Sequence, residues 1–86
     1  MVKYRVVLSR QAVKDLERLR KAGPGEKAKV VKDILVNNPY TLPYEKLVGN
    51  LSGKYSRRIN IQHRMVYTID DEAQIVKILR MWTHYD

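Results

Sequence analysis

The chain has 86 residues, enough for one small domain, and we expect residues 1–86 to form a single folded unit. Its 17 basic and 9 acidic residues give a formal charge of +8, which favours a nucleic acid, an anionic membrane or an acidic protein as partner. The chain has no cysteine, no long apolar run and no signal-peptide pattern. The sequence therefore excludes disulfide bonds, thiolate metal sites and a membrane span, and we expect a cytoplasmic protein.

The first half of the chain has the pattern of one strand followed by two helices. Residues 3–8 are typical of a short strand, and Ser9 is a good N-cap for the helix that follows. Gly23-Pro24-Gly25 ends this helix, and a second helix is expected over residues 26–37. The apolar stripes of the two helices are Ala12, Val13, Leu16 and Leu19, and Ala28, Val31, Ile34 and Leu35.

The second half has the pattern of four strands. A short strand over residues 44–48 is followed by two antiparallel strands that meet at a reversal near Gln62 and His63. The last strand, over residues 74–85, is apolar on both faces, which predicts a central strand or a bulge near Arg80. The order β-α-α-β-β-β-β predicts an α+β fold, with a two-helix hairpin on one face of a mostly antiparallel sheet of four or five strands.

Residues 50–67 (NLSGKYSRRINIQHRMVY) mix strand-forming residues with the cations Arg57, Arg58, His63 and Arg64. Strand alternation places Arg58 and Arg64 together on the sheet face that the helices leave open. Such a face attracts phosphate. The apolar face would carry Tyr55, Ile59, Ile61, Met65, Tyr67 and Ile69, and the open face Ser56, Arg58, Asn60, Gln62, Arg64, Val66 and Thr68.

Residues 44–69 (YEKLVGNLSGKYSRRINIQHRMVYTI), together with the terminal pair His84-Tyr85, closely resemble the YoeB/Txe toxins of the RelE superfamily. The NLSG turn, the SRRI run, the His-Arg pair before an apolar-Val-Tyr strand and the final His-Tyr occur in the family's order and spacing. The first half matches in pattern only and lacks the Trp-rich N-terminal helix of some members. The resemblance implies a RelE-like fold and a metal-free, cofactor-free endoribonuclease that cuts mRNA, generally in the ribosomal A site.

The resemblance also assigns site residues. The glutamate before the NLSG turn is Glu45, the arginine after the turn histidine is Arg64, and the terminal pair is His84-Tyr85. Glu45 would be the general base, His84 the general acid, and Arg64 would stabilise charge on the phosphate. Tyr85 would orient the phosphate or share the proton transfer. Further phosphate contacts are expected from Arg58, Lys46, Arg57 and Lys54, and no residue is expected to bind a metal.

The implied partners are mRNA, the ribosome and a cognate antitoxin that holds the toxin inactive. The resemblance leaves room for a toxin dimer or a toxin–antitoxin hetero-oligomer, and it implies contact with operator DNA only through the antitoxin. No membrane partner is expected.

Three other functions stay open from the residues alone. A non-catalytic RNA-binding or ribosome-binding module would keep the basic face without needing Glu45 and His84. A toxin of the same fold directed at DNA gyrase would not need Glu45, Arg64 and His84-Tyr85 together. A DNA-binding subunit is the third, although no helix-turn-helix pattern is evident. The remaining candidates are interpreted structurally, with His63 as a turn residue, Tyr55 and Tyr67 as core residues, and Trp82 as a packing residue.

Overall fold

The structure, a computed structural model, describes residues 3–23 and 25–81. The order of its elements confirms the predicted β-α-α-β-β-β-β arrangement and the α+β class. Neither helix in these two ranges is long and apolar enough to cross a membrane. The elements are β1 (Arg5–Leu8), α1 (Arg10–Ala22), α2 (Gly25–Asn37), β2 (Glu45–Lys46), a 3-10 turn η1 (Gly49–Leu51), β3 (Tyr55–Arg58), β4 (Arg64–Asp70) and β5 (Ile75–Arg80).

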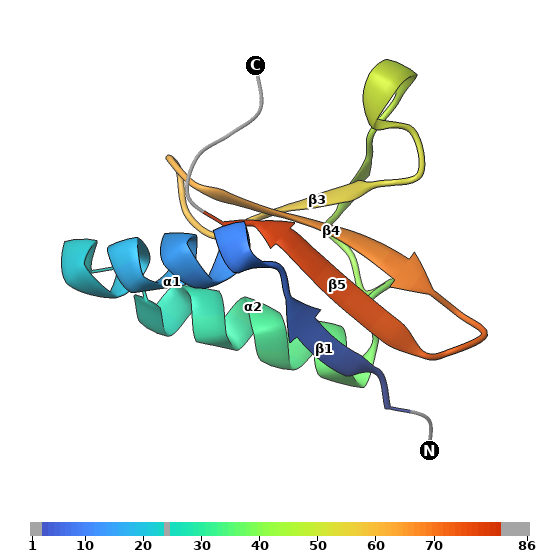
Figure 1. The fold of residues 1–86 in the computed structure, drawn as a ribbon, viewed down its shortest axis with the longest axis horizontal. Coiled ribbons are helices and arrows are strands. Elements are labelled where there is room, and N and C mark those ends of the chain that lie inside the picture. Colours follow the sequence, from blue (N-terminus) through green and yellow to red (C-terminus); the bar gives the residue numbers. More distant parts are fainter. Residues whose placement is uncertain (1–2, 24, 82–86) are drawn as a thin grey trace.

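The five strands form one sheet in the order β1-β5-β4-β3-β2. Only β1 and β5 run parallel, and the other three pairings are antiparallel. The helices α1 and α2 lie next to each other on one face of this sheet, as Figure 1 shows. The predicted hairpin on a mostly antiparallel sheet is therefore confirmed, and the opposite face is left for other contacts.

The last strand carries a bulge close to its end. Val66 of β4 pairs with Arg80, whereas its neighbour Tyr67 pairs with Ile78, so Leu79 is the extra residue on β5. This confirms the predicted bulge near Arg80 and places β5 in the interior of the sheet, between β1 and β4. A bulge bends the strand that carries it, so the direction of the chain changes just before β5 ends.

The hydrophobic core lies between the helix pair and the sheet. The apolar stripe of α2 is buried much as predicted, but the buried line of α1 differs from the prediction. Val13 is 46% exposed, whereas Asp15 is completely buried. A spacing of three and four residues puts Asp15 in line with Ala12 and Leu19, so this carboxylate faces the core. The core residues are Ala12, Leu19, Ala28, Val31, Leu35, Ile59, Met65, Tyr67, Val76, Ile78 and Met81.

The turn between β3 and β4 corrects two predicted face assignments. Ile61 was expected on the apolar face but is 94% exposed, because β3 ends at Arg58 and the chain has already begun to reverse. Asn60 holds this turn, since its Oδ1 accepts hydrogen bonds from the backbone N–H groups of Gln62 and His63. His63 is thus the turn residue that was expected, although it is buried. Val66, expected on the open face, is also fully buried.

Asp15 ties α1 to the end of β5. Its Oδ1 accepts a hydrogen bond from Gln11 Nε2 at 2.9 Å, and its Oδ2 accepts bonds from Arg80 Nε and the Met81 backbone N–H, each at 3.0 Å. Burial raises the pKa of Asp15, but these hydrogen bonds and the Arg80 charge outweigh it and hold the pKa below its ordinary value of 3.8. The ionised form therefore stabilises the folded chain.

This lowered pKa makes folding sensitive to acid. A carboxyl group whose pKa is depressed on folding stabilises the protein above its unfolded-state pKa, about 3.9, and the stabilisation is lost as the pH falls through the folded value. We expect Asp15→Asn to cost about 1–3 kcal/mol at neutral pH, as for a buried group that loses its partners. In urea unfolding between pH 7 and pH 3, this variant should lose less stability on acidification than the wild type.

Glu17 provides the matched control for this measurement. It is an exposed acid on the same helix, so Glu17→Gln removes the same charge without touching the buried carboxylate. The acid dependence of Glu17→Gln should follow that of the wild type. An Asp15→Asn variant with the full wild-type acid dependence would show that another group is responsible.

Candidate active site

The open face of the sheet carries two arginines directly opposite each other. The β3–β4 register pairs Arg58 with Arg64, and it pairs the neighbouring Arg57 with the core residue Met65. Because successive side chains point to opposite faces, Arg58 and Arg64 share the face away from the helices, as predicted. Like charges directly opposite each other destabilise a strand pair, and a bound anion would relieve that repulsion.

Glu45 reaches these arginines from the edge of the sheet. It pairs with Ser56 across β2 and β3, which places it on the same face as Arg58. Its Oε2 lies 3.5 Å from Arg64 Nη1, so the glutamate spans β3 to contact β4. The two side chains are 67% and 30% exposed, respectively. An ion pair this exposed contributes about 0–1 kcal/mol, so either partner can exchange it for another ligand at little cost.

Four of the predicted site residues, Glu45, Arg57, Arg58 and Arg64, line one hollow. It has a volume of about 260 Å³, and Glu45, Arg58 and Arg64 come to it from three different strands. Sequence reasoning missed two of its polar residues, Tyr44 and Ser56, although alternation had placed Ser56 on the same face as Arg58. The hollow therefore combines one carboxylate with several cations. Its lining residues are Pro43, Tyr44, Glu45, Ser56, Arg57, Arg58 and Arg64.

Arg57, predicted as a further phosphate contact, lies in the wall of the hollow but is largely buried. It is only 4% exposed, and its Nη2 donates a hydrogen bond to the backbone carbonyl of Thr41. The physical reason is strand alternation, which turns Arg57 to the face opposite Arg58. Thr41 begins the segment that leads into Glu45. The hydrogen bond from Arg57, which lines the hollow, therefore helps to hold that segment in place.

Aromatic rings also hold the segment before Glu45. The ring centroid of Tyr44 lies 5.7 Å from that of Tyr55, and Tyr55 stacks on Tyr67 at 5.8 Å. Both distances fall in the favourable range for aromatic pairs. Burial raises the pKa of Tyr67, and the nearby Arg57 charge opposes part of that rise. Tyr55 and Tyr67 thus pack in and against the core, as expected, while Tyr44 also faces the hollow.

Two of the other predicted site residues, Lys46 and Lys54, do not lie at this hollow. Lys46 pairs with Tyr55, which turns it to the face opposite Glu45, and Lys54 is half-buried just before β3. Neither lysine lines the hollow. His84 and Tyr85 lie outside the described residues, as does Trp82. In the part of the chain that the structure does describe, no group of three or more His, Cys, Asp or Glu side chains is placed to hold a metal ion.

Comparison with known proteins adds a family match. The model of a family described as "YoeB-like toxin of bacterial type II toxin-antitoxin system" matches residues 11–85. Toxin YoeB of Synechocystis sp. (strain ATCC 27184 / PCC 6803 / Kazusa) is 51% identical over 41 residues, which are 48% of this chain and 45% of that protein. The aligned stretch thus spans less than half the length of this curated relative.

Two solved structures extend the comparison to nearly the whole chain. A YoeB/ParE toxin from Agrobacterium tumefaciens is 25% identical with a TM-score of 0.85, and the alignment covers 94% of this chain and 99% of that one. A chain of the YoeB-YefM complex from Staphylococcus aureus is 32% identical with a TM-score of 0.78, over 98% of this chain and all of that one. The hollow therefore sits on a fold shared with toxins of this group.

Proposed function

Because this chain belongs to the YoeB-like toxin family of bacterial type II toxin–antitoxin systems, we propose that it is an endoribonuclease that cleaves mRNA in the ribosomal A site. The observation that carries this proposal is the hollow in which Glu45 lies 3.5 Å from Arg64 and beside Arg58. A base next to two cations suits the cleavage of RNA through its own 2′-OH group, because the base can take the hydroxyl proton and the cations can stabilise charge on the phosphate.

The proposed reaction is a transesterification followed by hydrolysis. Glu45 takes the proton of the 2′-OH group, and the 2′-oxygen forms a bond to the adjacent phosphorus. The resulting phosphorane breaks its bond to the 5′-oxygen of the next nucleotide, and His84 gives that oxygen a proton. The products are a 2′,3′-cyclic phosphate, which water opens to a 3′-phosphate, and a 5′-OH end. Since the substrate supplies the nucleophile, the scheme needs neither a metal-bound water nor a cofactor.

The arginines have two tasks in this scheme. Arg64 and Arg58 would stabilise the charge that builds up on the non-bridging oxygens of the phosphorane. When phosphate enters, Arg64 would exchange its weak contact with Glu45 for the phosphate oxygen. This exchange releases the carboxylate at the moment it is needed as a base. Tyr85 would hydrogen-bond the phosphate or share the proton transfer.

The ribosome would supply the positioning that so small a protein lacks. General acid–base groups contribute about 10²–10⁴-fold each, and correct placement of the reacting groups contributes further. The formal charge of +8 supports binding to a surface rich in RNA phosphate. We therefore infer that mRNA held in the A site is the substrate, and that ribosomal RNA helps to hold the toxin.

A cognate antitoxin is the proposed protein partner, and the similarity to the YoeB-YefM complex supports it. An acidic segment of the antitoxin that folds on binding would cover Arg58 and Arg64 or displace His84-Tyr85. The first contact would block the hollow to phosphate, and the second would remove the proposed general acid. We place this chain in a toxin dimer or a toxin–antitoxin hetero-oligomer, in which the antitoxin makes the contacts to operator DNA.

Expression of this protein without an antitoxin should arrest growth by halting translation. The test is pulse-labelling of newly made protein after induction, with the Glu45→Gln variant as the control that keeps the fold and the charge of the arginines. Labelling should fall sharply with the wild type and stay normal with the variant. Undiminished labelling in the presence of folded wild-type protein would rule out the toxin activity proposed here.

A further inference from the structure

We propose that Tyr40 and Asp71 are positioning residues for Glu45, an inference that rests on the proposed ribonuclease function. Neither of the two lines the hollow that contains Glu45. Tyr40 lies between α2 and β2, and Asp71 lies in the turn between β4 and β5. They act through the aromatic ring of Tyr44, the residue directly before Glu45.

The strand that carries Glu45 is held only weakly by its own backbone pairing. β2 is two residues long and forms an edge of the sheet, where it pairs with β3. One further backbone hydrogen bond follows, from the Leu47 N–H to the Lys54 carbonyl at 3.0 Å. Short, exposed stretches of backbone pairing open readily. The 3.5 Å contact between Glu45 and Arg64 therefore depends on the side chains that hold this segment.

Three tyrosine rings pack together next to Glu45. The ring centroid of Tyr40 lies 6.4 Å from that of Tyr44 and 6.3 Å from that of Tyr55, and the last two are 5.7 Å apart. All three pairs meet edge to face, an arrangement that aromatic rings favour. Tyr55 also pairs through its backbone with Lys46. The residues on both sides of Glu45 are thus attached to Tyr55.

Asp71 fixes the ring of Tyr40 through the phenol hydroxyl. This hydroxyl lies 2.8 Å from Asp71 Oδ1 and 2.7 Å from Oδ2, and it donates its hydrogen bond to this carboxylate. Hydrogen bonds to an ionised acceptor are stronger than those between neutral groups. Burial and the Asp71 carboxylate raise the pKa of Tyr40, so the hydroxyl keeps the proton that it donates. A continuous path of contacts thus leads from Asp71 through Tyr40 to Tyr44.

Tyr4 provides the matched control for the hydroxyl of Tyr40. The Tyr4 hydroxyl donates to the same carboxylate, at 2.9 Å from Asp71 Oδ1. Tyr4 lies just before β1, however, at the opposite edge of the sheet from β2. Tyr4→Phe therefore removes a hydrogen bond to Asp71 and leaves the path to Tyr44 intact.

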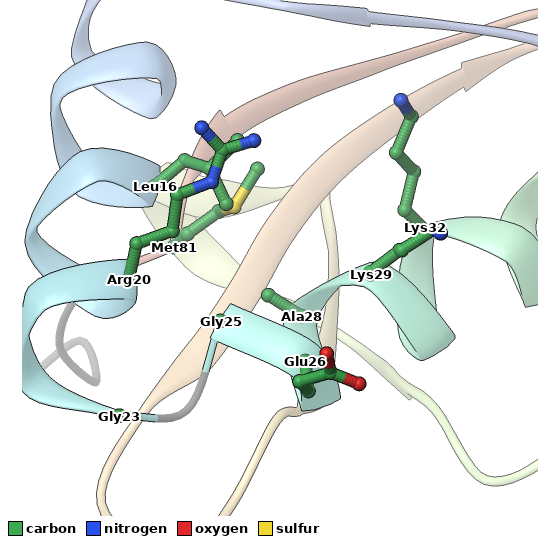
Figure 2. A pocket seen from close by; sticks show the side chains of 9 residues that line it. All are labelled: Leu16, Arg20, Gly23, Gly25, Glu26, Ala28, Lys29, Lys32 and Met81. Atoms are coloured by element: carbon green, nitrogen blue, oxygen red, sulfur yellow. The ribbon is translucent and has the colours of Figure 1, made fainter.

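The helix pair provides a control for a loss of stability alone. Another hollow, of about 410 Å³, lies between α1 and α2, as Figure 2 shows. Leu16 lines it and packs against the core, whereas neither Tyr40 nor Asp71 is among its lining residues. Leu16→Ala should therefore weaken the packing of the helices without touching the segment before Glu45.

The experiment measures cleavage of ribosome-bound mRNA, with rates normalised to the folded fraction, for Tyr40→Phe, Asp71→Ala, the double variant, Tyr4→Phe and Leu16→Ala. We expect kcat to fall about 10-fold in Tyr40→Phe and in Asp71→Ala, since a misplacement of about 1 Å can cost about 10²-fold in rate. KM should stay nearly unchanged, because the arginines are untouched. The double variant should be no slower than Asp71→Ala, since both changes break one path. Both controls should keep the wild-type kcat.

Hydrogen exchange at the Leu47 amide, followed by NMR, tests the same path without any RNA. This amide donates the hydrogen bond that follows β2, so its exchange reports how often the segment opens. Exchange should become faster in Tyr40→Phe and in Asp71→Ala, and it should stay at the wild-type rate in Tyr4→Phe.

Three outcomes would overturn the inference. They are a wild-type kcat in folded Tyr40→Phe, an equal loss of kcat in Tyr4→Phe, and an unchanged exchange rate at Leu47 in both Tyr40→Phe and Asp71→Ala. If Tyr40→Phe does not fold, the kcat and the exchange rate of Asp71→Ala decide the matter. A wild-type protein that cuts no RNA at all would instead remove the ribonuclease proposal, and the catalytic role of this path with it.

Discussion

Replacing Glu45 by Gln, or His84 by Gln, is expected to slow mRNA cleavage by about 10²–10⁴-fold each while the variant still binds the ribosome. Glutamine has the shape of glutamate and replaces histidine with a neutral hydrogen-bonding group, but it cannot take up or release the proton at the reacting oxygen. Glu45 is largely exposed, so its replacement should change the free energy of unfolding by no more than about 0.5 kcal/mol. Single-turnover cleavage and ribosome sedimentation measure the two effects separately.

Arg64→Ala supplies the contrast in this experiment. It removes a phosphate contact, so it should weaken binding as well as cleavage, and it should lower the salt dependence of binding. Glu45→Gln should bind as well as the wild type or slightly better, because it removes a negative charge beside the RNA. Glu72 is an exposed acid in the β4–β5 turn, and Glu72→Gln is the matched control. This variant should change neither ribosome binding nor cleavage. If both Gln variants at the site cut normally, the active site lies elsewhere on the chain.

Removal of the 2′-OH group at the cleaved nucleotide should abolish cleavage by the wild-type protein altogether. The proposed reaction has no nucleophile other than this hydroxyl, so a 2′-deoxy or 2′-O-methyl sugar leaves nothing to attack the phosphorus. The effect should exceed that of any single side-chain change, since those variants retain the nucleophile. Binding should change little, because the phosphates that the arginines are proposed to contact are still present.

The measurement uses mRNA with one modified sugar, placed either at the cut site or one nucleotide away from it. Only the first substrate should resist cleavage, and the products of unmodified mRNA should carry 2′,3′-cyclic phosphate or 3′-phosphate ends. Cleavage at the modified nucleotide would show that the 2′-OH group is not the nucleophile. In that case the roles of Glu45 and His84 as base and acid would both be wrong.

The order and type of the elements followed from local signals in the sequence. Ser9 caps α1 through its side chain, and Gly23 ends the helix with a φ of +112°, a conformation that residues with a Cβ rarely adopt. The bulge near Arg80 was likewise evident as a break in strand alternation. Each of these features depends on residues within a few positions of one another, so periodicity and capping suffice to predict them.

Part of the candidate site could also be predicted from the sequence. The pairing of Arg58 with Arg64 needs only a turn between two adjacent strands and the alternation of side chains along them. The resemblance in residues 44–69 named Glu45 as their companion. The same alternation, applied strictly, would have turned Arg57 to the core. Likewise, helical spacing from Ala12 and Leu19 would have placed Asp15 on the buried face.

Only the tertiary structure decided which distant residues meet. The contact of Glu45 with Arg64 depends on the pairing of the two-residue strand β2 with β3, for which the sequence carries no strong local signal. Arg57 is buried because the segment at Thr41 folds back over it, and Asp15 meets Met81 across most of the chain length. Such contacts follow from how the helices pack on the sheet, and no local pattern encodes that packing.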